Sequence, residues 1–473
     1  MFINWLHRLS VVVFTCVLFS HCAGPSIRPD LEKIRDLSRM QLPNTLETAT
    51  VEPVTSHDVE QLLSQPLSVD SALRIAIANN RHVRASLREL GISRGQYMQA
   101  SLIANPEVEL EVLPERDSLL EFRVEYNISS LILAPLRRKA SYFDMEAARY
   151  KTAAKLIEIG FEVRRAFYAA IAAASRFKFA QQTLDAFAAD RDAAQALLEA
   201  GNITDLDFAN REAAYQQARL EASEVEFEVM RSREKLNRLL GLFGKQTTWQ
   251  VAGQLTPAPQ TLDTQENTEN RAIAASLELQ EVQSRLKALS RRIGVTRTEG
   301  WLPSVNVDFH LLSGNPNQTS RDPNLRYGGG VGLALPIFDH KQGQTRAGEA
   351  EFDGLQERYY GLAIDIRSGA REARAQLAVT HARARHYEQK LLPAQKKVLE
   401  QTQLQYNAMQ IGIFELLRAK RDLLQVELGY INSLRDYWTA AAAFEAILAG
   451  KRVDQEPSPQ TTSTYQPNSQ GDH

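Results

Sequence analysis

The sequence predicts a mainly α-helical fold that also contributes four β-strands to a membrane β-barrel. Three features of its 473 residues indicate this fold: two helical stretches of roughly sixty residues or more, two pairs of alternating strands, and the same order of elements in both halves. The periodicity predicts helices at about 70–102, 137–200, 204–242, 266–298, 341–409 and 413–449. The repeated unit is therefore helix, strand, strand, long helix, turn and helix.

The two longest predicted helices need partners along their whole length. At a rise of about 1.5 Å per residue, each is on the order of 90 to 100 Å long, which exceeds any globular core. Each carries residues at alternating spacings of four and three, the pattern of a coiled-coil seam. A soluble coiled-coil rod would show the same periodicity. The seam residues are Leu156, Gly160, Val163, Phe167, Ala170, Ala174 and Phe177, and, in the second half, Ala363, Ile366, Ala370, Ala373, Leu377, Thr380 and Ala384.

Pro393 lies inside the predicted helix 341–409. Because proline has no backbone N–H, it removes one helical hydrogen bond. We therefore expect either a bend in one helix or a break between two helical segments at this position.

Two interruptions of the helical pattern predict β-hairpins. Apolar and polar residues alternate in strands at about 107–113 and 119–131, and again at about 303–313 and 326–338. A membrane-spanning sheet must close into a barrel, and four strands are too few, so several chains must share one barrel. A soluble two-hairpin sheet would leave the long helices unexplained. The polar face of the first hairpin, expected to line the barrel lumen, holds Glu107, Glu109, Glu111, Glu121, Arg123 and Glu125.

Composition and motifs argue against a nucleic-acid partner and against enzymatic activity. The formal net charge is -2 with 24% charged residues, so no basic field exists for a polyanion. His381 and His386 are five residues apart, about 140° around a helix, and not on one face as a zinc pair would be. We find no phosphate-binding loop, no nucleophile elbow and no cysteine cluster. The sequence predicts no catalytic residue, no metal site and no cofactor.

The two ends of the chain are expected to lie outside the repeated core. Residues 1–22 contain an apolar run of signal-peptide length and end at Cys22, which we expect to be a lipid-acylation site; the alternative is a leader that is cleaved elsewhere. Residues 23–66 predict an extended arm and 451–473 a disordered tail, neither contributing to a core. The first repeat then covers 67–250 and the second 251–450.

Several motifs in this duplicated order resemble the TolC family of outer-membrane efflux factors. The resemblance covers about residues 66–450, and the order of the motifs is more specific than any one of them. The matching positions are Leu67, Ser68, Val69, Asp70, Ser71, Ala72, Leu73, Ala76, Asn79 and Asn80, then Gln99, Ala100, Asn105 and Pro106, then residues 333–339, and the glycine-containing helical turns at Gly201 and Gly412.

The resemblance implies a homotrimer with a shared twelve-stranded barrel in the outer membrane and a long helical barrel in the periplasm. It implies a passive exit duct for small solutes, drugs or metal cations, working with a periplasmic adaptor and an inner-membrane pump. Residues 406–417 are similar to those of channels that serve cation or heavy-metal exporters. Alternatives are an outlet for type I protein secretion and a soluble periplasmic coiled-coil adaptor.

The two helical turns should form the periplasmic tips, where the family has a narrow mouth lined by polar residues. The positions that correspond best are Glu415 and Arg418 in the second repeat, and Asp205 and Asp207 in the first. A ring of charge there would filter or gate solutes electrostatically. The alternative for these residues is a solvated helix face. Arg418 departs from the acids that the family often has.

Overall fold

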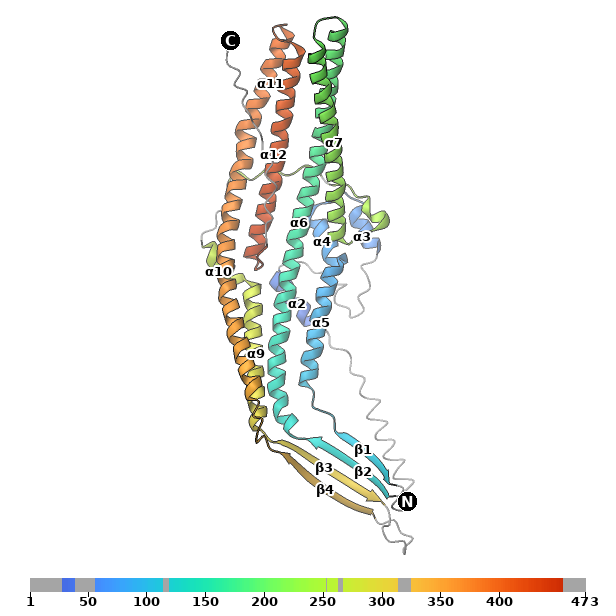
Figure 1. Cartoon of the computed structure of the whole chain (residues 1–473), viewed down its shortest axis with the longest axis vertical. Coiled ribbons are helices and arrows are strands. Elements are labelled where there is room, and N and C mark those ends of the chain that lie inside the picture. Colours follow the sequence, from blue (N-terminus) through green and yellow to red (C-terminus); the bar gives the residue numbers. More distant parts are fainter. Residues whose placement is uncertain are drawn as a thin grey trace.

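The computed structural model describes residues 28–38, 56–113, 119–251, 253–262, 267–313 and 325–453. The chain is elongated, with a four-stranded sheet at one end and long helices running away from it to two helical tips (Figure 1). The leader, the expected acylation site Cys22 and most of the predicted C-terminal tail lie outside the described residues. Expectations about them remain predictions.

Both halves contain the predicted order of elements, which confirms the repeated unit. The first consists of α4 (Val69–Asn79), α5 (Arg81–Ser101), β1 (Glu107–Leu113), β2 (Leu119–Asn127), α6 (Ser129–Glu199) and α7 (Asp205–Leu240), followed by a short 3-10 turn, η3 (Gly244–Thr247). The second consists of α8 (Thr268–Ala275), α9 (Leu277–Trp301), β3 (Ser304–Ser313), β4 (Leu325–Ala334), α10 (Gln342–His386), η4 (Tyr387–Leu391), α11 (Leu392–Asn407) and α12 (Ile413–Leu448).

The first predicted helix of each repeat is in fact two helices. Asn80 has extended backbone angles, and its side-chain oxygen accepts hydrogen bonds from the backbone N–H groups of His82 and Val83 at the start of α5. Ser276 does the same for Leu279 at the start of α9. Periodicity continues through both positions, so it cannot reveal a residue that ends one helix and caps the next.

The strands that lead into the long helices end earlier than predicted. β2 ends at Asn127 and α6 begins at Ser129, because the Asn127 side-chain oxygen accepts from the backbone N–H of Ser130. β4 ends at Ala334, before Pro336, which has no N–H to donate to a ladder. The following N–H, of Ile337, donates to the carbonyl of Leu335 in a tight turn.

All four strands form one antiparallel sheet in the order β1-β2-β3-β4. The central pair, β2 and β3, joins the two repeats, with Arg123 opposite His310 and Glu125 opposite Asp308. Both edge strands, β1 and β4, have one side without a partner strand within the described chain.

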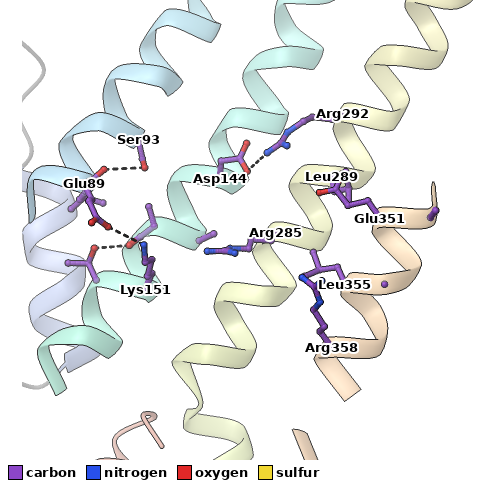
Figure 2. A pocket seen from close by; sticks show the side chains of 16 residues that line it. Glu89, Ser93, Asp144, Lys151, Arg285, Leu289, Arg292, Glu351, Leu355 and Arg358 are labelled. Carbon is purple, nitrogen blue, oxygen red and sulfur yellow. Dashed lines mark hydrogen bonds and ion pairs between the residues drawn. The ribbon is translucent and has the colours of Figure 1, made fainter. Parts of the chain in front are cut away.

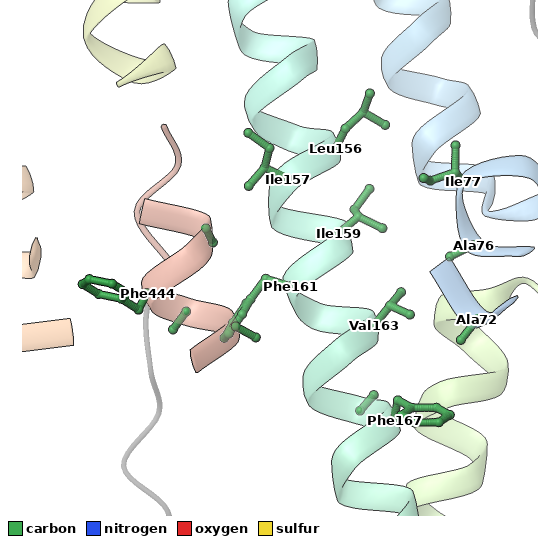
Figure 3. Packing of buried hydrophobic residues seen from close by; sticks show 14 of the residues in the cluster. Ala72, Ala76, Ile77, Leu156, Ile157, Ile159, Phe161, Val163, Phe167 and Phe444 are labelled. Atoms are coloured by element: carbon green, nitrogen blue, oxygen red, sulfur yellow. The ribbon is translucent and has the colours of Figure 1, made fainter. Parts of the chain in front are cut away.

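Small and aliphatic side chains form a core that follows α6 and reaches α4, α7 and α12 (Figure 3). Most predicted seam residues are buried, including Leu156, Val163, Ile366 and Ala370, which confirms the coiled-coil periodicity. At the edges of the pattern, Ala174 is exposed and Phe177 and Ala363 are half-buried. The many alanines allow the helix backbones to approach closely.

Pro393 changes the helical register without ending the helix. The preceding residues form the π-helical turn η4, in which the N–H of Leu392 donates to the carbonyl of Tyr387, five residues back. The wider turn accommodates the missing donor of the proline. Opposite it, Gly429 of α12 leaves space for the ring of Tyr387, which a Cβ atom would approach to 2.7 Å.

The expected extended arm instead contains two helices, α2 (Arg28–Ser38) and α3 (Ser56–Leu63). α2 is part of the core, because Leu31 and Ile34 lie on one face at helical spacing and are both buried. Asp30 of α2 is 0% exposed and forms ion pairs with Arg94 of α5 and Arg149 of α6. The sequence interpretation missed this helix because its single apolar face is only eleven residues long.

We predict that Asp30→Asn will release α2. The substitution removes the carboxylate that two partly buried arginines share, a loss on the order of 3 kcal/mol or more. Trypsin should therefore cleave at Lys33 and Arg35 in α2 about a hundredfold faster. Glu89→Gln is the matched control, since the Lys151–Glu89 pair is largely exposed and should leave the cleavage rate unchanged. An unchanged rate in Asp30→Asn would show that apolar packing alone holds α2.

Candidate functional site

The sheet has one charged face. Directly paired residues of an antiparallel sheet point to the same side, and the register pairs Glu107 with Glu125, Glu109 with Arg123 and Glu111 with Glu121. All six residues predicted for the lumen therefore share one face: Glu107, Glu109, Glu111, Glu121, Arg123 and Glu125. Pairing of β2 with β3 adds Asp308 and His310, which sequence reasoning did not select although they alternate in the same way.

Negative charge dominates this face. Among its described residues are six carboxylates, those of the five glutamates and Asp308, against the guanidinium groups of Arg123 and Arg326. Arg123 Nη2 lies 2.7 Å from Glu121 Oε1 and its Nη1 lies 3.6 Å from Glu109 Oε2. Within the described residues, Glu107, Glu111 and Glu125 form no ion pair, so the face should attract cations.

Glycines in β4 make room for the side chains of β3. Gly328 and Gly330 pair with His310 and Asp308, so all four positions belong to the charged face. A Cβ atom at Gly330 would lie 2.5 Å from Asp308 Oδ1, and one at Gly328 would overlap the His310 ring. These glycines lie inside β4, and the side chains of His310 and Asp308 occupy the space that a Cβ atom would need.

The opposite face of the sheet is apolar and exposed. It carries Val108 and Leu110 from β1, Phe309 from β3, and Val331 and Leu333 from β4, all of them largely open in the single chain. A contiguous exposed apolar surface of this kind marks a contact with lipid or another protein. The alternation predicted from sequence is thus confirmed as two chemically distinct faces.

The two helical tips lie at the end of the molecule far from the sheet (Figure 1). The backbones of the two tips have equivalent hydrogen bonds. The N–H of Gly201 donates to the carbonyl of Leu198, and the N–H of Met409 donates to the carbonyl of Tyr406, three residues back in each case. Both Gly201 and Met409 have left-handed backbone angles. The glycines of the two turns, Gly201 and Gly412, are therefore not equivalent, because Gly412 caps α12.

The predicted mouth residues lie in the first turn of α7 and in the first two turns of α12. Asp207 and Glu415 occupy equivalent positions, three residues after the caps Thr204 and Gly412. Asp207 accepts hydrogen bonds from the Thr204 hydroxyl and N–H, and these bonds lower the pKa of its carboxyl group. Gly412 has no hydroxyl to offer Glu415. Asp205, Glu415 and Arg418 are exposed at the tips.

The two repeats contact each other near the tips through arginine–aromatic pairs. The Arg211 guanidinium of α7 lies 4.2 Å from the ring centre of Phe414 in α12. In return, Arg421 of α12 lies 4.5 Å from the ring centre of Phe187 in α6. No periodic pattern in the sequence indicates these pairs, because each joins residues of different repeats.

Asp190 is the buried carboxylate between these pairs, at 1% exposure. Its Oδ2 atom lies 3.3 Å from Arg211 Nη1. Burial lowers the pKa of the Arg421 guanidinium, and the nearby charge of Asp190 acts in the opposite direction. The carboxylate therefore favours the charged form of the half-buried Arg421.

A polar cavity of about 570 Å³ lies between α5, α6, α9 and α10 (Figure 2). Its charged residues are mostly paired with each other, Lys151 with Glu89 at 3.1 Å and Arg292 with Asp144 at 2.6 Å. Within the described ranges, no group of three or more His, Cys, Asp or Glu side chains is arranged to hold a metal ion. Nor does any described helix have the length and apolarity needed to cross a membrane.

Comparison with known proteins identifies the family. Residues 72–242 and 269–450 match the family described as outer membrane efflux protein. The chain belongs to this family. It is 27% identical over 392 residues to the cobalt-zinc-cadmium resistance protein CzcC of Cupriavidus metallidurans, covering 81% of this chain and 90% of that protein.

Solved structures of outer-membrane proteins share the fold. The outer-membrane channel OprN superimposes with a TM-score of 0.69 at 17% identity, covering 83% of this chain and 92% of that chain. VceC from Vibrio cholerae gives 0.65 at 14% identity, with 81% and 96% covered. The protein is thus an outer-membrane efflux channel with its helical part in the periplasm, and not an enzyme. Family membership excludes the soluble periplasmic adaptor.

We predict that Arg421→Ala will loosen both hairpins near the tips. The contact with Phe187 joins the repeats, and its loss should cost about 0.5 to 2 kcal/mol. Amide hydrogen exchange around residues 183–195 and 414–425 should become about 2- to 30-fold faster.

Arg191→Ala is the matched control, because Arg191 stacks on Tyr215 at 4.4 Å within the first repeat. This variant should speed exchange in α6 and α7 but not in α12. If Arg421→Ala changed α12 alone, the inferred connection between the repeats would be wrong.

Proposed function

We propose that the protein is a homotrimeric, passive exit duct for divalent metal cations, coupled to a periplasmic adaptor and an inner-membrane pump. The observation that carries the proposal is the two-faced sheet with unpaired edges at β1 and β4. Three copies, joined edge to edge, give a closed twelve-stranded barrel. Closure satisfies every backbone group in lipid, with the apolar face outward and the charged face around the lumen.

Metal cations are the favoured solute for two reasons. Unbalanced carboxylates on the charged face, including Glu107, Glu111 and Glu125, would raise the local cation concentration in a narrow lumen. The related CzcC is named for resistance to cobalt, zinc and cadmium. Organic drugs and secreted polypeptides remain the alternative cargo classes, since the pump selects the substrate.

The helical tips are proposed as the periplasmic mouth. Glu415 and Arg418, with Asp205, lie exposed within the first two helical turns after the tips, while Asp207 is engaged by Thr204. Around a threefold axis these charges would form a ring that filters solutes; a solvated helix face remains the alternative role. Acylation of Cys22 would add a lipid anchor to each copy.

Deletion of the gene tests the proposed cargo. The deletion strain should accumulate zinc, cobalt or cadmium and lose resistance to them, and the wild-type gene should restore both. Resistance to organic drugs is the internal control and should not change. A strain with unchanged metal accumulation but increased drug sensitivity, or with a secreted protein retained in the cell, would reassign the cargo.

We predict cation selectivity for channels reconstituted in planar bilayers. Reversal potentials at low salt should indicate cation preference, and the double change Glu109→Gln with Glu125→Gln should weaken it, because it removes six carboxylates per trimer. The preference should fade at 1 M salt, where the Debye length falls to about 3 Å.

Arg123→Gln is the control of opposite sign. Removing this cation from the same face should strengthen cation preference. Anion preference at low salt in the unmodified channel would mean that the apolar and charged faces are assigned the wrong way round or that the tips set selectivity.

A further inference from the structure

Exposed apolar residues continue beyond the strands toward the helices. After β4, Leu335, Ile337 and Phe338 are exposed, the last at 90%. Trp301 at the end of α9 is 75% exposed, and Leu131 and Ile132 in the first turn of α6 are also open. We call these six residues the collar. They come from three separate segments that all adjoin the helix-side end of the sheet.

Within the described residues, the strands alone supply only part of a full-height apolar band. On β3 the apolar face runs from Val305 to Leu311, which is about 20 Å along the strand at about 3.3 Å per residue. With a strand tilt of about 40°, the height along the membrane normal is roughly 15 Å, against a typical apolar band of about 25 Å. The collar adds apolar height at the helix-side end of the sheet.

The collar is held in place at its centre. The Trp301 ring stacks on His340 with 5.0 Å between ring centres and 25° between planes. The Gly300 carbonyl lies 3.2 Å from His340 Nδ1. A Cβ atom on Gly300 would overlap the His340 backbone, so the two segments cross in direct contact. Packing, and not a loose loop, therefore positions Trp301.

Basic residues follow the collar along α6. Arg137, Arg138 and Lys139 come between one and two helical turns after Ile132, about 8 to 10 Å further along the helix. All three are exposed. An apolar segment followed by exposed cations at this distance matches acyl chains followed by phosphate headgroups, and tryptophan prefers the boundary between them.

We propose that the collar is immersed in the periplasmic leaflet of the outer membrane and that Arg138 and Lys139 contact phospholipid headgroups. The membrane surface then lies about two and a half turns into α6, not at the strand ends. The lipid is the favoured occupant because the collar continues the apolar face of a sheet that belongs to an outer-membrane channel. The inference rests on the barrel proposed above.

Tryptophan quenching by brominated phospholipid tests the collar. Reconstituted Trp301→Phe should lose at least half of the lipid-quenchable emission of the unmodified protein. Trp438→Phe is the matched control and should lose none, because Trp438 lies in α12 and donates to the Thr256 carbonyl in the helical region. Phe338→Trp, added to Trp301→Phe, should restore the quenching. Bromines near the headgroup should quench more strongly than bromines near the chain ends.

Conductance of the same vesicles separates the two proposals. Conducting channels whose quenchable emission is unchanged by Trp301→Phe and not increased by Phe338→Trp would overturn the collar while leaving the barrel intact. Vesicles without conductance, in which no tryptophan responds to the lipid, would overturn the barrel itself.

Discussion

The backbone pairing of β2 with β3 is the interaction on which the channel end of the molecule depends. It fixes Arg123 opposite His310 and Glu125 opposite Asp308, so the faces of the two hairpins agree. A slip of one residue would turn the acids of one hairpin toward the apolar side of the other. With the faces aligned, the sheet becomes a single wall with one unpaired edge from each repeat, suited to join copies of itself in a ring.

The four alternating strands were predictable because the two-residue period and the polar face are both local, although β2 and β4 each end four residues before the predicted position. Cap-dependent boundaries were not: Asn80 and Ser276 interrupt the helices through side-chain hydrogen bonds that leave the apolar period intact. The short helix α2 was missed because its apolar face spans only eleven residues, and its ion pairs through Asp30 are made with two helices that are distant in the sequence. A sequence pattern describes one segment, whereas these helix boundaries and the position of α2 depend on specific side-chain contacts outside that pattern.

The candidate sites also include features that a single segment predicts and features that depend on contacts between segments. The charged face follows from alternation along single strands, and register then adds residues from the second hairpin. The contacts of Arg211 with Phe414 and Arg421 with Phe187 join different repeats, and only the packed helices bring them together. At the tips, Gly201 and Gly412 look alike in the sequence but have different roles. Gly201 has a left-handed backbone conformation, whereas Gly412 caps α12.

The two tips show how one duplicated backbone acquires different chemistry. In the first tip Thr204 and Asp207 satisfy each other, which keeps the pKa of the acid low and occupies its oxygens. In the second, Gly412 replaces the threonine, so the equivalent Glu415 has no capping hydroxyl as a partner. The left-handed position changes from Gly201 to Met409, which accepts a conformation disfavoured for side chains and is 93% exposed. The second tip therefore lacks the hydrogen bond that a capping hydroxyl provides in the first, and it leaves the carboxylate of Glu415 and the side chain of Met409 exposed.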